Sequence, residues 1–371
     1  MMISAGEASG ELYGALLSRE IKKIWPDADI MGIGGSRMKK EGVRLIASTS
    51  SAIGITEVIM HLKEIIKTYR IAKNALVDQK PDVLVLIDYP DFNLTLAKKA
   101  KRAGVPILYY VSPQVWAWRA GRVKKIAALV NKMAVLFPFE VELYRDAGLA
   151  CEFVGHPVAE SINISSSSEE LKKELGLDPA KKVIAVLPGS RPAEIKNHQS
   201  LVKDISEMIH KEFHDVQILV PLVSGTGFTI DIPSYVHVIY DRTREVVACS
   251  EAAAAASGTV TLETALLGTP MVVFYKVSAI TFFLARILVS VKFASLVNLL
   301  SDREVVREYI QKNATAENIF REIKKIISDN DYRQAMKTEL QKVSEIMKDK
   351  TASPRVASIV GEMAGWNPIN A

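Results

Sequence analysis

The feature that most constrains the fold of this chain is a regular alternation of short apolar runs with longer amphipathic segments. In the N-terminal half the apolar runs are Ile30–Ile33, Val83–Ile87, Ile107–Val111 and Met133–Phe137. Helical patterns accompany them, near Glu11–Ile24, Ile55–Val77, Asn93–Ala103 and Arg119–Val130. Short apolar runs that alternate with helices indicate buried parallel strands joined by crossover helices.

The alternation resumes in the C-terminal half. Further strands are predicted at Val183–Leu187, Val216–Pro221, Val236–Ile239, Ala252–Ala256 and Met271–Phe274. A polar stretch rich in serine, Asn163–Glu170, precedes them as a linker or the start of a peripheral helix, and the last segment, Asp329–Trp366, is helical. At 371 residues the chain is too long for one ordinary core. We therefore predict an α/β fold of two Rossmann-like, doubly wound domains facing a cleft, with ligands at the C-terminal ends of the strands.

The predicted domains are residues 1–160 and 161–340, and the helical segment 341–371 is expected to pack back toward the N-terminal domain. The formal net charge of +5 arises entirely in residues 1–160, which hold 22 Lys and Arg against 17 Asp and Glu. This excess is too small to indicate nucleic acid, but it suggests that the N-terminal half meets something anionic. Two cysteines without metal-ligand spacing and no visible signal peptide favour a reducing cytoplasm.

Two turns of small residues lie where predicted strands end and helices begin. One is Gly189-Ser190-Arg191 and the other is Ser257-Gly258-Thr259. Glycine lets backbone N–H groups approach an anion, the following helix adds its positive end, and Arg191 offers a forked cation to phosphate oxygens. Glu263 could accept hydrogen bonds from sugar hydroxyls. Each turn alone could be an ordinary strand-to-helix connection, but together they favour a site for a nucleotide-sugar diphosphate.

Candidate catalytic and acceptor-binding residues follow strands of the N-terminal half. Asp88 comes directly after the most apolar strand, where a carboxylate can take a proton from an attacking hydroxyl, and Asp91 is predicted to cap the helix near Asn93. Glu7 and Ser9 lie in the first turn, which is either an acceptor-sugar site or a helix-capping loop.

Ser112 and Trp116 follow the next strand. Trp116 and Trp118 could line the cleft, stack on a sugar or acyl chain, or pack in the core. His156, at the suspected domain junction, could reach the cleft or stabilise a hinge. The six histidines are scattered, and we expect neither a metal site nor a cofactor.

An apolar stripe at helical spacing runs through residues 55–69 and includes Ile59, Leu62 and Ile66. The stripe indicates a core-facing helix. Because lysines and arginines flank it, it also fits a surface that binds a membrane or an acyl chain. A second stripe lies between Ile280 and Val291, in a region whose charge-free runs are too short for a spanning helix.

Seven of these motifs occur together and in order over roughly residues 3–320: Ser4–Gly10, Pro90–Asn93, Tyr110–Trp118, Val154–Pro157, Leu187–Arg191, Ser257–Thr259 and Pro270–Val273. In this the chain closely resembles the bacterial lipid-A-disaccharide synthase family. The resemblance implies a metal-independent, inverting glycosyltransferase of B-type architecture. It also implies the donor UDP-2,3-diacylglucosamine and the acceptor 2,3-diacylglucosamine 1-phosphate, with a β-1,6-linked disaccharide and UDP as products.

Family pattern places the donor diphosphate against the two small-residue turns, Glu263 near the ribose, and Asp88 on the family's important aspartate. It places Asn298 on an asparagine that matters for substrate, although Val297 stands where the family generally has proline and the segment Val306–Glu308 lacks another.

A cytoplasmic protein attached peripherally to the inner leaflet through the stripe is expected, with a homodimer among the possible assemblies. A UDP-GlcNAc 2-epimerase, or a related soluble glycosyltransferase, is the alternative within enzymes. A non-catalytic nucleotide-sugar-binding scaffold is the alternative outside them.

Overall fold

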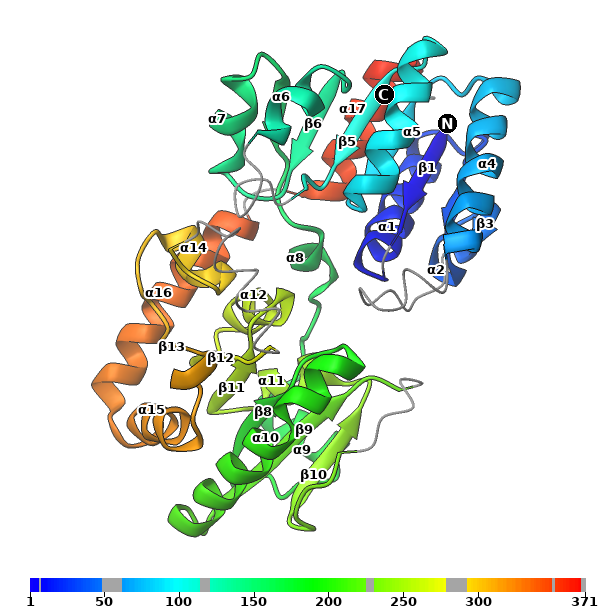
Figure 1. Ribbon diagram of the computed structural model, residues 1–371. Coiled ribbons are helices and arrows are strands. Elements are labelled where there is room, and N and C mark those ends of the chain that lie inside the picture. The colour runs from blue at the N-terminus through cyan, green and yellow to red at the C-terminus, as the bar shows by residue number, and fades with distance from the viewer. Residues whose placement is uncertain are drawn as a thin grey trace. The chain divides into compact units, whose positions relative to one another are not determined.

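A computed structural model describes residues 1–6, 8–48, 62–113, 121–224, 230–277, 292–348 and 351–367, with the backbone alone for Ala8 and Leu62. The chain forms two compact units (Figure 1). The first comprises Met1–Pro157 and Lys350–Ala371, and the second comprises Val158–Asp349. Each unit is an α/β structure around one parallel sheet.

The first unit contains a seven-stranded sheet in the order β3-β2-β1-β4-β5-β6-β7. Its strands are β1 (Met2–Ala5), β2 (Met31–Gly34), β3 (Arg44–Ser48), β4 (Leu84–Ile87), β5 (Ile107–Tyr110), β6 (Lys132–Val135) and β7 (Ala150–Phe153). Its helices are α1 (Ala8–Ile24), α2 (Ser36–Lys40), α4 (Leu62–Gln79), α5 (Pro90–Arg102), α6 (Arg122–Ala127), α7 (Glu140–Arg145) and α17 (Ala352–Ala364). The four central strands, β1, β2, β4 and β5, are buried throughout, as expected for parallel strands covered on both faces.

The second unit contains a six-stranded parallel sheet in the order β10-β9-β8-β11-β12-β13. Its strands are β8 (Lys182–Leu187), β9 (Val216–Leu222), β10 (Val236–Tyr240), β11 (Ala252–Ala256), β12 (Met271–Tyr275) and β13 (Glu308–Ile310). Its helical elements are α9 (Ser168–Glu174), α10 (Pro192–Glu212), α11 (Thr243–Ala248), α12 (Thr259–Leu266), α14 (Leu296–Ser301), η1 (Gln311–Asn313), α15 (Ala316–Ser328) and α16 (Asn330–Lys348). The chain passes from the first unit to the second within α8 (Pro157–Ser161).

The C-terminal helix α17, red in Figure 1, returns to the first unit and packs against α1. A Cβ atom on Gly361 would lie 2.3 Å from the Trp25 ring, so this contact requires glycine. Arg355 of α17 donates to both carboxylate oxygens of Glu152 on β7, at 2.5 and 2.9 Å. Aromatic packing and a bidentate ion pair therefore fasten the helix to the sheet of the first unit.

Candidate active site

In the first unit, the strand order reverses between β1 and β4, which lie side by side in the centre of the sheet. Parallel α/β sheets bind ligands in the crevice outside the carboxyl ends of the strands at such a point. The turn after β1 leads to Ser9 in the first turn of α1, and Asp88 directly follows β4. The structure therefore brings the first turn of the chain and Asp88 to the same edge of the sheet.

Asp88 is held in an unusual backbone conformation. Both Asp88 and Tyr89 have φ of +47°, in the left-handed region that residues other than glycine rarely adopt. The Asp88 carbonyl accepts hydrogen bonds from Asn93 Nδ2 at 2.7 Å and from the Tyr109 hydroxyl at 2.8 Å. Burial raises the pKa of Tyr109, which keeps this hydroxyl protonated as a donor. The half-buried Asp88 therefore lies in a turn whose backbone is held by hydrogen bonds from Asn93 and Tyr109.

Asn93 is the residue that joins the turn after β4 to β1. Its fully buried amide accepts from Ser4 Oγ at 2.6 Å and donates to the carbonyls of Ser4, Ile87 and Asp88. Asn93 ends the motif Pro90–Asn93 that contributes to the family resemblance, but its positioning role depends on contacts between segments far apart in the chain. Gly6 belongs to the same arrangement, because a Cβ atom there would lie 2.2 Å from the Tyr89 ring.

Asp91 does not have its predicted capping role. Helix α5 begins at Pro90, before the expected start near Asn93, and proline is well suited to a first helical position. Asp91 therefore lies in the first turn of the helix, where it is largely exposed and forms an ion pair with Arg122 at 2.9 Å.

Two of the other acceptor candidates, Ser9 and Ser112, belong to the described residues. Ser9 is half-buried at the start of α1, whereas Glu7 and Trp116 lie outside the described residues. Ser112 is buried, donates to the Pro113 carbonyl at 2.8 Å and accepts from the Tyr144 hydroxyl at 2.6 Å. Its hydroxyl is therefore engaged in holding the segment after β5.

In the second unit, the strand order reverses between β8 and β11. The two predicted small-residue turns directly follow these strands: Gly189–Arg191 leads from β8 into α10, and Ser257–Thr259 leads from β11 into α12. The structure therefore brings together two turns that are far apart in sequence, at the point where this class of sheet binds ligands. Ser190, Arg191, Gly258 and Thr259 are exposed.

The turn after β8 already holds a carboxylate of the chain itself. Glu194 Oε2 accepts from the backbone N–H groups of Ser190 and Arg191, at 3.2 and 3.3 Å. Arg191 Nη1 approaches the other oxygen of Glu194 at 3.4 Å, while the Arg191 side chain remains 68% exposed. Glu194 lies three residues after Arg191, which precedes the first residue of α10, and an acidic residue at this position is a recognisable capping signal that the sequence could have indicated.

Asn298 does not present its amide to a ligand in this structure. It is fully buried, accepts from the N–H groups of Val305 and Val306, and donates to the Val306 carbonyl and Glu308 Oε1. Both the oxygen and the nitrogen of the Asn298 amide are therefore engaged within the chain. Val297 lies in the first turn of α14, which begins after Ser295, whose side chain accepts from Asn298 N–H.

The Asn298 network reaches the turn after β11 through Glu308. The Glu308 carboxylate accepts from the N–H groups of Ala294 and Ser295, at 2.7 and 2.9 Å. The Ala294 carbonyl in turn accepts from Ser257 Oγ at 2.8 Å. Asn298 is therefore connected to the candidate donor site, although it is not part of its surface.

Glu263 lies on α12 and is paired with Arg244, a residue that sequence reasoning did not single out. Arg244 Nη2 and Nε donate to Glu263 Oε1 at 2.7 and 2.9 Å. The same guanidinium donates to the carbonyl and hydroxyl of Ser161. No local pattern marks Arg244, because its partners are brought to it by the fold.

His198 of α10 links the segments that follow β8 and β12. Lys276 N–H donates to its Nε2 at 3.0 Å, so Nδ1 carries the proton and donates to the Pro188 carbonyl at 2.6 Å. Burial lowers the pKa of His198, which favours this neutral form. His156 of the first unit is also buried, with its ring 5.9 Å from Tyr13 and edge-on to it, and burial lowers its pKa to about 3.

The predicted membrane-facing residues are only partly described. Ile59 lies outside the described residues, as does the second stripe, and Leu62 is the first residue of α4. Ile66 is 42% exposed, whereas Ile65 and Tyr69 from the same stripe pack against the core of the first unit. The stripe is thus divided between core and surface. Within the described ranges, no helix is long and apolar enough to cross a membrane, and no group of acidic, histidine and cysteine side chains could hold a metal ion.

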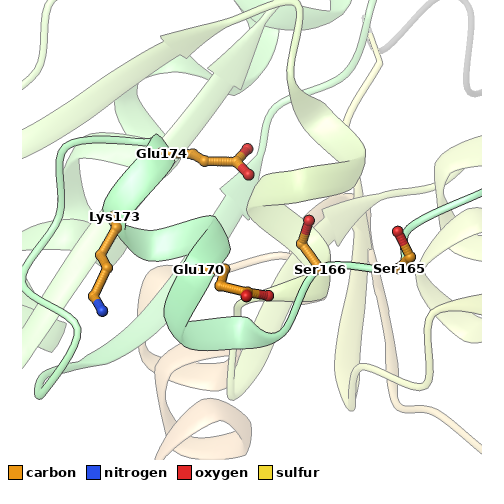
Figure 2. Close-up of a pocket in the computed structure, with 5 residues that line it drawn as sticks. All are labelled: Ser165, Ser166, Glu170, Lys173 and Glu174. Atoms are coloured by element: carbon orange, nitrogen blue, oxygen red, sulfur yellow. The ribbon is translucent and has the colours of Figure 1, made fainter.

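A hollow lies on the second unit beside α9, lined by Ser165, Ser166, Glu170, Lys173 and Glu174 (Figure 2). These side chains have local structural roles: Glu170 caps α9 through Ser167, and Glu174 forms an ion pair with Arg242 at 2.7 Å. None of the predicted site residues lines this hollow.

Two solved structures share this arrangement of parallel sheets. The UDP-GlcNAc 2-epimerase from Neisseria meningitidis bound to UDP-GlcNAc aligns with a TM-score of 0.64 and 13% identity, over 97% of this chain and 99% of that one. A ugt transferase from Siraitia grosvenorii in complex with UDP aligns with a TM-score of 0.64 and 14% identity, over 98% and 99%. At such identities the likeness shows the fold alone, which is the two-domain fold of B-type glycosyltransferases and these epimerases.

Sequence relatives identify the family to which the chain belongs within this class of fold. The family model described as lipid-A-disaccharide synthetase matches residues 1–359. The lipid-A-disaccharide synthases of Geobacter metallireducens and Geobacter sulfurreducens are 42% and 41% identical over 373 residues, which cover 98% of this chain and 97% of each relative. The chain belongs to the lipid-A-disaccharide synthase family.

Proposed function

We propose that this chain transfers a diacylglucosaminyl group from UDP-2,3-diacylglucosamine to 2,3-diacylglucosamine 1-phosphate in lipid A biosynthesis. The products are the β-1,6-linked lipid A disaccharide 1-phosphate and UDP. The observation that carries this proposal is the family match over residues 1–359. The placement of the candidate residues beside the switch points of both sheets supports it.

Asp88 is the proposed general base. The 6-hydroxyl of the acceptor attacks the anomeric carbon of the donor and gives its proton to the Asp88 carboxylate. The bond between that carbon and the diphosphate oxygen breaks, and UDP leaves with the electron pair. Attack from the face opposite UDP inverts the anomeric configuration. Asn93 and Tyr109 support this role because they fix the backbone that carries the carboxylate.

The second unit is proposed to bind the donor, and the first unit the acceptor. The turn Ser257–Thr259 and the start of α12 offer backbone N–H groups to the diphosphate, and Arg191 adds an exposed positive charge. These groups would stabilise the charge that develops on the leaving UDP, without a metal ion. Ile66 and the exposed Lys63, Lys67 and Arg70 of α4 support peripheral binding of the first unit to the inner leaflet of the cytoplasmic membrane.

The test is release of UDP from UDP-2,3-diacylglucosamine, with and without the monosaccharide 1-phosphate, in detergent buffer containing EDTA. Acceptor-dependent release together with a β-linked disaccharide is expected. If the folded protein releases UDP only when a divalent cation is restored, the metal-independent mechanism is wrong. Interconversion of UDP-GlcNAc with its 2-epimer, without disaccharide formation, would instead support the epimerase alternative.

A further inference from the structure

We infer that Arg244 is a positioning residue that sets the Glu263 carboxylate for the ribose of the donor and ties it to the end of α8. The inference rests on the proposed function, which makes the second unit the donor-binding unit. The Arg244 guanidinium bonds to two segments that are distant in sequence, at Ser161 and at Glu263.

The contacts of Arg244 are charge-assisted and partly shielded from water. Nε and Nη2 donate to Glu263 Oε1 at 2.9 and 2.7 Å. Nη1 donates to the Ser161 carbonyl at 2.6 Å, and Nη2 also donates to Ser161 Oγ at 2.9 Å. The side chains of Arg244 and Glu263 are 28% and 19% exposed. Hydrogen bonds between a guanidinium and a carboxylate in such surroundings are stronger and more directional than those of an exposed ion pair.

The pairing leaves one carboxylate oxygen for a ligand. Both bonds from Arg244 go to Oε1, and within the described parts of the chain no hydrogen bond to Oε2 is found. A carboxylate oxygen fixed in this way is an acceptor suited to the vicinal hydroxyls of a ribose. Glu263 lies on α12, which starts at the switch point of the second sheet, so this acceptor belongs to the proposed donor-binding unit.

The other partner of Arg244 lies where the chain enters the second unit. Ser161 is the last residue of α8, and the chain passes between the units at Pro157 and Val158. A ribose that fixes Glu263 therefore also restrains Arg244, and through it the connecting segment. By linkage, the strength of ribose binding and the order of this segment change together.

The experiment compares the affinities of the full chain for UDP and for 2′-deoxy-UDP by titration calorimetry. Loss of a hydroxyl that bonds to a charged acceptor is expected to weaken wild-type binding about tenfold. In Arg244→Gln and in Glu263→Gln, the ratio of the two affinities should fall to within about twofold, and Arg244→Lys should restore part of it. Arg242→Gln is the matched control: Arg242 lies two residues away, pairs with Glu174 and Glu245, and should leave the ratio unchanged.

A second measurement follows hydrogen–deuterium exchange in residues 158–164. UDP should slow this exchange in wild type and have a smaller effect in Glu263→Gln, which keeps both contacts from Arg244 to Ser161 and so remains informative if Arg244→Gln fails to fold. A wild-type ratio in folded Arg244→Gln, or an unchanged exchange response in Glu263→Gln, would overturn the inference. A wild type that binds both nucleotides equally would overturn it while leaving the proposed function standing. A wild type that does not bind UDP would overturn both.

Discussion

The carboxylate of Glu194 accepts a hydrogen bond from the backbone N–H of Ser190 at 3.2 Å, and the neighbouring N–H of Arg191 donates to the same oxygen at 3.3 Å. Gly189 makes this contact possible, because its φ is +114° and a Cβ atom there would lie 2.7 Å from that oxygen. These are the N–H groups that the sequence suggested for the donor diphosphate. In this structure a carboxylate of the chain satisfies them, so a diphosphate that approaches this turn meets a negative charge.

We expect Glu194→Gln to tighten UDP binding and to lower stability. Removing the charge relieves its repulsion of the diphosphate. One charge at a helix end is worth about 0.3–1 kcal/mol, so the affinity for UDP should rise roughly two- to fivefold. The weaker acceptor also caps the helix less well, so the free energy of unfolding should fall by about 1 kcal/mol. Calorimetric titration with UDP and urea unfolding measure the two effects.

The control for this variant is Glu170→Gln. Glu170 caps α9 in the same way, accepting from the Ser167 N–H at 2.7 Å, but it does not belong to either donor turn. It should lose similar stability without any change in UDP affinity. If Glu194→Gln binds UDP more weakly than wild type, Glu194 supports the donor site and the repulsion argument is wrong.

Asp88→Asn should lower kcat by about 10²–10⁴-fold, because the variant cannot accept the proton of the attacking hydroxyl. UDP affinity and the unfolding midpoint should stay near wild type, since Asn93 and Tyr109 hold the turn through the Asp88 backbone carbonyl, which the substitution keeps. Asp91→Asn is the matched control, an exposed carboxylate in the first turn of α5 that should leave kcat nearly unchanged. Turnover of Asp88→Asn within a few-fold of wild type would remove Asp88 from the base role.

Sequence patterns predicted the central strands well and missed three edge strands. β3, β7 and β13 lie at the edges of their sheets, and most of their residues are partly exposed. Without the continuous apolar run of a buried parallel strand, their short mixed sequences carry little signal. The C-terminal segment was predicted as helical, and the structure divides it into α16, in the second unit, and α17, in the first.

Site residues that directly follow a strand could be predicted from the sequence. Site residues that depend on tertiary contacts could not. Asp88 and the two small-residue turns could be located because each directly follows a recognisable strand. Arg244 could not, because its partners Ser161 and Glu263 reach it only through the fold. The same holds for His198, whose ring joins Pro188 to Lys276.

Combined replacement of Ile59, Leu62 and Ile66 by serine should release the protein from membranes. Burying a large aliphatic side chain in an apolar phase is worth about 1.5–3 kcal/mol, so partial insertion of even one should change vesicle binding about tenfold. Ile66 alone is the sharpest single test, since its side chain is 42% exposed. Cosedimentation with vesicles containing anionic lipid measures the effect, and Val77→Ser, 46% exposed near the other end of α4, is the control. Unchanged sedimentation of the triple variant would exclude this surface as the membrane contact.

His156 should make the first unit sensitive to acid. Burial lowers its pKa from 6.5 to about 3, so the folded chain keeps the ring neutral while the unfolded chain takes up a proton below about pH 6.5. Its contribution to stability is therefore complete above that pH and is lost as the pH falls toward 3, by about 1.4 kcal/mol per pH unit. His156→Gln should be less stable at neutral pH, with a smaller loss on acidification.

Tryptophan fluorescence isolates this effect, because all four tryptophans, Trp25, Trp116, Trp118 and Trp366, fall within the residue ranges of the first unit. Urea unfolding at pH 7, 5.5 and 4.5 gives the free energy of unfolding of wild type and His156→Gln. Their difference should shrink as the pH falls, because carboxylates that titrate in both proteins cancel. A difference that stays constant over this range would mean that the folded protein accommodates a protonated His156, and that the aromatic packing around Tyr13 and Phe137 does not keep the ring neutral.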